Sequence, residues 1–131
     1  MPNTPLMIGA GATVLCRGKF ATEAHLNFAK SLFASAGITL TLEENLLDAV
    51  TAVSGSGPAY FFYLIEAMVQ AAVELGITRA DALALAAQTA LGAARMVLET
   101  GAEPEELRRR VTSPGGTTQA AVQVLDEAAV K

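Results

Sequence analysis

Cysteine and long apolar runs are scarce in this sequence, and each shortage excludes a class of protein. Cys16 is the only cysteine among 131 residues, so no internal disulfide can form and no second thiol is available for a metal site. No apolar run reaches the roughly 18 residues that a membrane span needs, and no basic segment precedes an apolar one near the start. The sequence therefore predicts a protein of the cytoplasm, without a membrane partner.

Charged residues are also few, at 17%, whereas apolar residues make up 52% and the net charge is −4. The one basic cluster, Arg108-Arg109-Arg110, has no interleaved aromatic residues, so nucleic acid is not expected as a partner. A monomer of this composition would expose an unusually apolar surface after folding. We therefore expect an obligate homo-oligomer.

The fingerprint of a dinucleotide-binding loop is missing. Gly9-Ala10-Gly11 is followed by Val14 where a third glycine is needed, and Gly55-Ser56-Gly57 is followed by Tyr60. The lone His25 has no recognisable partner for binding a metal, so we interpret it as a surface histidine and expect no metal site. The chain thus carries no phosphate loop of its own.

The first 43 residues are predicted to form a strand, a helix and a strand. Thr13–Cys16 is a plausible short strand, and apolar residues recur at helical spacing over Ala21–Ala36, with Gly37 placed to stop the helix. Ile38–Leu42 alternates strictly, as a strand with one buried face does. Met1–Pro5 contains two prolines and is expected to be an extended loop.

After Glu43-Glu44 the pattern is helical throughout. The expected helices are about Asn45–Val53, Pro58–Leu75, Arg79–Glu99, a short one opening at Pro104, and Gln119–Ala128. The helix over Arg79–Glu99 is apolar almost all round, which is typical of a helix buried on every side. In a chain this small only a partner subunit can bury it, so we predict that it forms the core of a dimer.

Two loops of small residues, Ser54–Pro58 and Ser113–Thr118, each stand directly before a helix. Helix N-termini offer unpaired N–H groups and a partial positive charge to anions. In the second loop, Gly115-Gly116 removes side chains that would block a ligand, and Thr117-Thr118 supplies hydroxyl groups. Spacing alone does not distinguish an anion site in the second loop from an ordinary turn and helix cap. The glycines of the first loop can equally let two helices cross closely.

Four segments resemble pyrroline-5-carboxylate reductase in their sequence, order and separation. They are Met1–Pro5, Asp48–Thr51, Ser54–Tyr60 and Ser113–Thr118, and the similarity extends over essentially the whole chain. The resemblance implies a mainly α fold. Residues 1–43 would be the strand-helix-strand remnant of a Rossmann domain, and residues 44–131 a C-terminal all-α dimerisation and substrate-binding domain of the 6-phosphogluconate-dehydrogenase-like type.

The resemblance also implies an oxidoreductase that reduces 1-pyrroline-5-carboxylate to L-proline with NADPH or NADH, as a homodimer or a higher homo-oligomer. The main cofactor site would lie in an N-terminal domain that this chain lacks. The substrate-binding residues so implied are Glu44, Ser113, Gly115, Gly116, Thr117 and Thr118. Thr118 would be the catalytic residue, facing the ring nitrogen, and Asn3 and Arg110 would contact the cofactor.

Two alternatives remain open at this point. The chain could be an oligomerisation module that is inactive because the other half of the enzyme is absent. It could also be the helical domain of a related imine reductase or hydroxyacid dehydrogenase, although the Ser113–Thr118 loop gives that reading no support. Nicotinamide binding separates the first alternative from an active enzyme, and substrate profiling separates the second.

Overall fold

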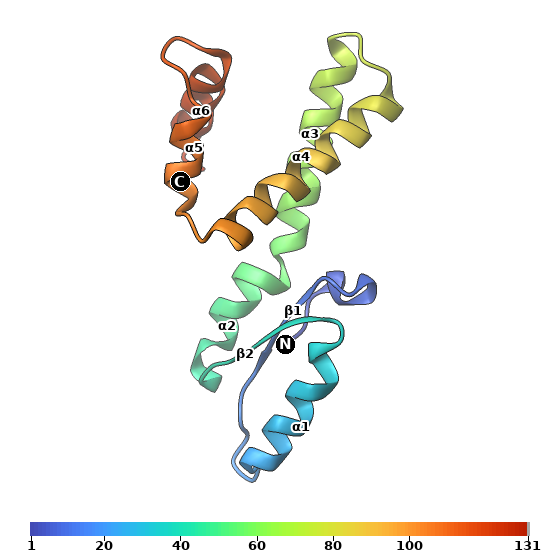
Figure 1. Ribbon diagram of the computed structural model, residues 1–131, viewed down its shortest axis with the longest axis vertical. Coiled ribbons are helices and arrows are strands. Elements are labelled where there is room, and N and C mark those ends of the chain that lie inside the picture. Colours follow the sequence, from blue (N-terminus) through green and yellow to red (C-terminus); the bar gives the residue numbers. More distant parts are fainter. Residues whose placement is uncertain (131) are drawn as a thin grey trace. The chain divides into compact units, whose positions relative to one another are not determined.

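The computed structural model describes residues 1–130 and divides into two compact units, residues 1–79 and the residues from 80 onward (Figure 1). Helices predominate in both units, and the first also holds two strands, which confirms the expected fold class. The elements of the first unit are η1 (Thr4–Ile8), β1 (Gly11–Leu15), α1 (Glu23–Ala34), β2 (Gly37–Thr41), η2 (Glu44–Leu46), α2 (Leu47–Val50), η3 (Thr51–Gly55) and α3 (Gly57–Glu74). The remaining helices are α4 (Arg79–Thr100), α5 (Pro104–Arg110) and α6 (Thr117–Glu127).

The two strands form a parallel pair in which Val14 stands opposite Leu40. Parallel strands need a crossover connection, and α1 supplies it. This helix packs against both strands, as Figure 1 shows. The predicted strand-helix-strand is therefore present, with β1 beginning two residues before its predicted start.

A capping box begins α1 and gives the lone histidine a structural role. The Thr22 hydroxyl accepts the His25 amide at 3.3 Å, and the His25 Nδ1 accepts the Thr22 amide at 3.4 Å. The helix ends at Ala34 rather than at the predicted glycine. Gly37 instead opens β2 with φ of 141°, a backbone conformation that residues other than glycine rarely adopt.

The N-terminal segment closes against β1, and the predicted extended loop stops at Asn3, because Thr4 and Pro5 already belong to a helical turn. Met1 and Val14 exchange two backbone hydrogen bonds, of 2.8 and 2.9 Å, as paired strand residues do. Thr4–Ile8 then forms a 3₁₀ turn with Pro5 near its start, where a missing N–H costs nothing. Gly9, with φ of 75°, ends that turn.

The small-residue stretch after α2 is mostly helical, and of the predicted loop at Ser54–Pro58 only Ser56 lies outside a helix, as the residue that caps α3. Thr51–Gly55 is a π-helical segment in which the Ser56 amide donates to the Thr51 carbonyl at 2.8 Å. The hydroxyl groups of Thr51 and Ser54 donate to carbonyls four residues earlier, which distorts helices locally. The Tyr60 hydroxyl donates to the Ala52 carbonyl at 3.1 Å and helps to hold the wide turn.

Helix α3 ends at Glu74, one residue before its predicted end, and a glycine follows two residues later. Gly76 has φ of 95°, its amide donates to the Val73 carbonyl, and the Ile77 amide donates to the Ala72 carbonyl, both at 3.0 Å. This pair of hydrogen bonds is the Schellman motif. The stop allows α4 to begin at Arg79, where the sequence places it.

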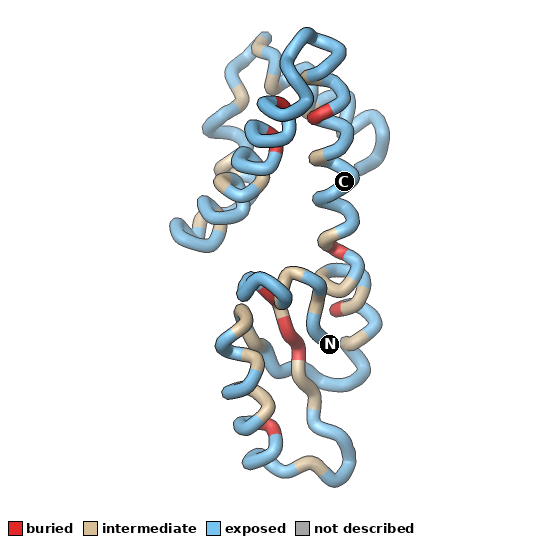
Figure 2. The backbone as a smooth tube through the Cα atoms, turned by 90° about the vertical axis from the view of Figure 1, so that its right-hand side faces the viewer, coloured by how far each residue is buried: buried red, intermediate tan, exposed pale blue. Residues whose placement is uncertain are grey.

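The chain buries very little of its own apolar surface. Within the described residues the buried apolar side chains are Val14, Leu26, Val50, Val69, Ala82 and Ala86. Figure 2 shows short buried stretches along a backbone that is otherwise exposed or intermediate. The aromatic run Tyr60–Tyr63 on α3 is 58–75% exposed. A soluble monomer rarely exposes such contiguous apolar surface, so helices of this kind need a partner surface.

Replacement of Gly37 tests the close approach of the two strands. A Cβ at this position would lie 1.9 Å from the Gly11 carbonyl oxygen, so we expect Gly37→Ala to lower the free energy of unfolding by about 3 kcal/mol or more. Urea unfolding followed by far-UV circular dichroism measures the change. Gly18→Ala is the matched control, because no heavy atom lies within 4 Å of its added Cβ. Equal stability of the two variants would contradict the observed strand pairing.

Candidate functional site

The loop Ser113–Thr118 leads into α6, which begins two residues earlier than the sequence suggests. Thr117 and Thr118 therefore lie in the first helical turn, with Gly116 as the residue that caps it. Because Gly116 has no side chain, it cannot cap the helix with a side-chain hydrogen bond. Gly115 adopts φ of 71°. The two glycines thus allow a tight turn whose backbone is open to approach.

The amides of this loop differ in their partners. The Gly116 amide donates to the Ser113 carbonyl at 3.0 Å, and the Gly115 amide donates to the side-chain Oε1 of Gln119 at 2.6 Å. Thr117 and Thr118 occupy the first turn, where a helix has no backbone acceptor for its N–H groups. These two amides are the donors that a bound anion could use without displacing another group.

Hydroxyl groups surround the same turn. Within the described residues, those of Ser113, Thr117 and Thr118 make no hydrogen bond. Thr118 is half-buried, whereas Ser113 and Thr117 are exposed. Of the predicted substrate residues of this loop, Ser113, Thr117 and Thr118 therefore carry hydroxyl groups that are free to donate, whereas the amides of Gly115 and Gly116 are already used.

Arg110 ends α5, three residues before the loop begins. Its guanidinium forms an exposed ion pair with Glu106 at 2.5 Å, one turn earlier on the same helix. The acidic first turn and basic last turn of α5 complement the helix dipole. Arg110 therefore has a structural explanation that does not require a cofactor.

Glu44 lies in the first unit, in a polar cavity of about 550 Å³ beside the carboxyl ends of both strands. Its charged neighbours in the lining include Arg17 and Glu23, which form an exposed ion pair at 2.8 Å. Glu44 itself is exposed at the start of η2. Its carboxylate makes no hydrogen bond within the described residues.

Asn3 lies at the other end of the strand pair. Its side-chain oxygen accepts the Ala12 amide at 2.9 Å, in a partly buried position near the start of β1. Glu44, in contrast, follows the end of β2. The structure therefore does not bring these two predicted residues together, and Asn3 already anchors the N-terminal segment. The other predicted residues, Arg110 and Ser113–Thr118, belong to the second unit.

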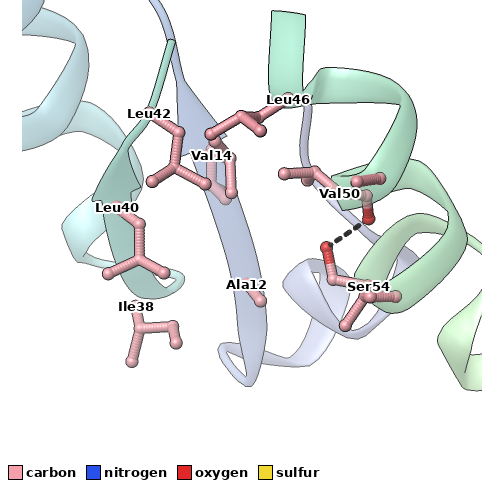
Figure 3. Close-up of a pocket in the computed structure, with 11 residues that line it drawn as sticks. Ala12, Val14, Ile38, Leu40, Leu42, Leu46, Val50 and Ser54 are labelled. Carbon is pink, nitrogen blue, oxygen red and sulfur yellow. Dashed lines mark hydrogen bonds between the residues drawn. The ribbon is translucent and has the colours of Figure 1, made fainter.

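A second cavity, of about 320 Å³, lies between the sheet and α2 (Figure 3). Apolar side chains from both strands, including Val14 and Leu40, face Leu46 and Val50 across it. Among its lining residues only Thr13 and Ser54 carry a hydroxyl group, and that of Ser54 donates to the Val50 carbonyl at 3.1 Å. With no charged group in its lining, this cavity is unsuited to a carboxylate substrate.

Two other features bear on the site. In the part of the chain that the structure describes, no group of three or more His, Cys, Asp or Glu side chains is arranged to hold a metal ion. No helix there has the length and apolar character to span a membrane.

Gln119 was not among the predicted residues, although glutamine at the third helical position is a known signal for a side chain that reaches back to a backbone amide.

Comparisons with known proteins agree with the sequence motifs. Residues 44–131 match the family model described as pyrroline-5-carboxylate reductase dimerisation. A pyrroline-5-carboxylate reductase from Corynebacterium melassecola is 45% identical over 131 residues, which are 100% of this chain and 48% of the relative. One from Pseudomonas aeruginosa is 52% identical over 124 residues, which are 94% of this chain and 45% of the relative.

Solved structures give the same result. A pyrroline-5-carboxylate reductase from Coxiella burnetii has a TM-score of 0.92 and 44% identity, covering 99% of this chain and 48% of that one. The Plasmodium falciparum enzyme, solved with NADP bound, has a TM-score of 0.92 and 32% identity, covering 99% of this chain and 53% of that one. The chain spans about half the length of the curated relatives that it matches. Because the family model covers most of its residues, this chain belongs to the pyrroline-5-carboxylate reductase family.

Proposed function

We propose that this chain is the dimerisation and substrate-binding half of an enzyme that reduces 1-pyrroline-5-carboxylate to L-proline with NADPH or NADH. The observation that carries the proposal is the 45% identity with a reductase along the entire chain. In this proposal, residues 1–43 are the end of the nucleotide-binding domain and residues 44–131 the helical domain. The compact units divide elsewhere, after Arg79, so that α2 and α3 belong to the same unit as the strands.

The loop Ser113–Thr118 is the proposed carboxylate site. The amides of Thr117 and Thr118 lie in the first turn of α6, so a carboxylate here would gain both hydrogen bonds and the helix dipole. Each hydrogen bond to a charged group contributes about 1.5–3 kcal/mol. The Ser113 hydroxyl, which has no partner in the described chain, would add a further donor. The carboxylate would thus be fixed by the backbone of one short loop.

Thr118 is the proposed catalytic residue. Its hydroxyl group lies on the same helical turn as the proposed carboxylate donors, so a ring anchored by its carboxylate could place its nitrogen within reach. A hydroxyl can both donate and accept a hydrogen bond, and it would orient the imine for reduction at the neighbouring carbon. Such orientation is worth up to about 7–11 kcal/mol of barrier. Glu44 is proposed as a further substrate-binding residue.

The residues present do not form a nucleotide site. The connection between β1 and α1, residues 16–22, contains Gly18 as its only glycine, so no phosphate-binding turn follows that strand. The Asn3 oxygen already accepts the Ala12 amide, and Arg110 is paired with Glu106. The nicotinamide would supply the hydride when bound, and its main site is proposed to lie in the half of the protein that this chain does not contain. We propose that the chain alone is inactive.

The first experiment measures assembly and ligand binding together. Because the exposed apolar helices require a partner surface, we expect light scattering to give about twice the 13.5 kDa mass of one chain. Titration of the same sample should show binding of L-proline but not of NADPH. A dimer that binds neither ligand would favour the plain oligomerisation module. A monomer, or tight NADPH binding, would contradict the proposed division of the protein.

The second experiment tests Thr118 in a chimera that joins this chain to the remaining half of the Pseudomonas relative. If Thr118 orients or protonates the imine, Thr118→Ala should lower kcat about 100-fold or more, with a smaller change in KM. Turnover is followed as NADPH oxidation with 1-pyrroline-5-carboxylate. The control is Thr112→Ala, since the Thr112 hydroxyl donates to the Arg108 carbonyl at 2.6 Å and has no proposed substrate contact. Unchanged kcat in Thr118→Ala would remove this residue from the mechanism.

A further inference from the structure

The π-helical segment η3 joins α2 to α3 with one residue more than a continuous α-helix would need. In an α-helix the Ser56 amide would donate to the Ala52 carbonyl, four residues earlier. Here the Ser56 amide donates to the Thr51 carbonyl at 2.8 Å, five residues earlier. The Ala52 carbonyl therefore loses the amide that would be its partner in an α-helix.

A side chain from the next helix replaces that lost donor. The Tyr60 hydroxyl, in the first turn of α3, donates to the Ala52 carbonyl at 3.1 Å. A return to an α-helical turn would give the Ser56 amide back to Ala52 and would rotate Tyr60 away from this carbonyl. The hydrogen bond from Tyr60 therefore favours the π-helical turn over the α-helical one.

The choice of turn sets the rotation of α3 about its own axis. Each residue of an α-helix turns the chain by about 100°, so a change of η3 to an α-helical turn would rotate α3 by that amount relative to α2. Helix α2 is held against the sheet by Val50, which is buried and lines the apolar cavity beside the strands (Figure 3). The orientation of α3 relative to the sheet is thus fixed at η3.

The face of α3 that such a rotation would move is apolar. Phe61, Leu64 and Met68 recur at helical spacing along this helix and are 40–61% exposed, whereas Val69 is buried within the chain. A rotation of about 100° would shift the exposed stripe by more than a quarter of the helix circumference. A second copy of the chain that packs on this stripe depends on its direction, because close packing requires complementary surfaces.

We propose that Tyr60 is a positioning residue for the dimer: its hydroxyl holds the π-helical turn and thereby sets which face of α3 meets a second copy of the chain. The inference rests on the proposed function, because it takes residues 44–131 as a dimerisation domain. The effect of the hydroxyl on assembly is indirect, since it bonds a carbonyl of its own chain.

The test compares Tyr60→Phe, which removes only the hydroxyl, with Tyr63→Phe. Tyr63 is the matched control, because it lies on the same helix and its hydroxyl makes no hydrogen bond within the described residues. Scalar coupling across hydrogen bonds in the ¹⁵N,¹³C-labelled chain identifies the carbonyl that accepts the Ser56 amide. We expect coupling to Thr51 in the unmodified chain and in Tyr63→Phe. In Tyr60→Phe this coupling should weaken and coupling to Ala52 should appear.

Assembly of the same proteins is measured by urea titration at several chain concentrations, which gives the dissociation constant of the dimer. Tyr60→Phe should raise this constant about 2- to 10-fold, the range that one neutral hydrogen bond allows. Tyr63→Phe should leave it unchanged. Equal constants in the two variants, or Ser56 coupling that stays with Thr51 in Tyr60→Phe, would overturn the inference.

Deletion of Val53 separates the turn from any other effect of the hydroxyl. Val53 is exposed. Without it the Ser56 amide reaches Thr51, and the Gly57 amide reaches Ala52, in an ordinary α-helix that keeps the rotation of α3. Tyr60→Phe should then leave the dissociation constant of the shortened chain unchanged, and a rise as large as in the unshortened chain would overturn the inference. If the shortened chain does not fold, the Ser56 coupling decides.

The outcomes also separate this inference from the proposed function. An unmodified chain that is monomeric would contradict the proposed dimerisation half, and the inference would fail with it. A dimer whose dissociation constant does not respond to Tyr60→Phe contradicts the inference alone and leaves the proposed function intact.

Discussion

Helices α3 and α4 carry more apolar surface than a chain of this size can bury in itself, and most other features depend on that excess. Six apolar side chains are buried in the described chain, while the aromatic run Tyr60–Tyr63 remains exposed. Domains of this length normally gain their stability from one contiguous core. Here the missing burial has to come from outside the described residues, and the match of residues 44–131 to a dimerisation family model favours a second copy of the chain. Folding and assembly are therefore expected to be one process.

The strand-helix-strand shows the same incompleteness on a smaller scale. Two parallel strands are fewer than a stable sheet needs, and Ile38 and Leu40 leave the apolar face of β2 more than half exposed. Local devices compensate in part: the capping box of Thr22 and His25, the Asn3 anchor on Ala12, and the pairing of Met1 with Val14. These contacts are individually worth about 1 kcal/mol. Together these contacts stabilise the strand-helix-strand by a few kcal/mol at most, which is little for a sheet of two strands.

Sequence reasoning succeeded where one residue dominates the local energy. Pro58 and Pro104 start helices and Gly76 ends one, because each has a backbone preference that neighbours cannot override. It failed at Ser54–Pro58, where small residues suggested a break. The outcome there depends on hydroxyl groups that bond back to carbonyls and on Tyr60, a contact eight residues apart. Periodicity contains no information about such contacts.

The same distinction applies to the candidate site. Composition and resemblance identified the loop Ser113–Thr118, since its glycines and hydroxyl groups are visible in the sequence. They did not identify Gln119, because its effect depends on where the side chain turns and not on its residue type. Resemblance alone implies the cofactor contact of Asn3, and the structure adds a structural role, because its side-chain oxygen accepts the Ala12 amide. The cofactor role of Asn3 remains a proposal.

The loop has one more consequence, which concerns protons. Its side chains are hydroxyl groups, a proline ring and glycine hydrogens, and none of these ionises between about pH 5 and pH 9. A carboxylate held by such a loop meets the same donors at every pH in that interval. If a change of pH within this interval alters the rate of the proposed reaction, the group that titrates must be the imine nitrogen, the cofactor or a residue outside the loop. The affinity of the loop for a carboxylate would then not depend on pH within this interval.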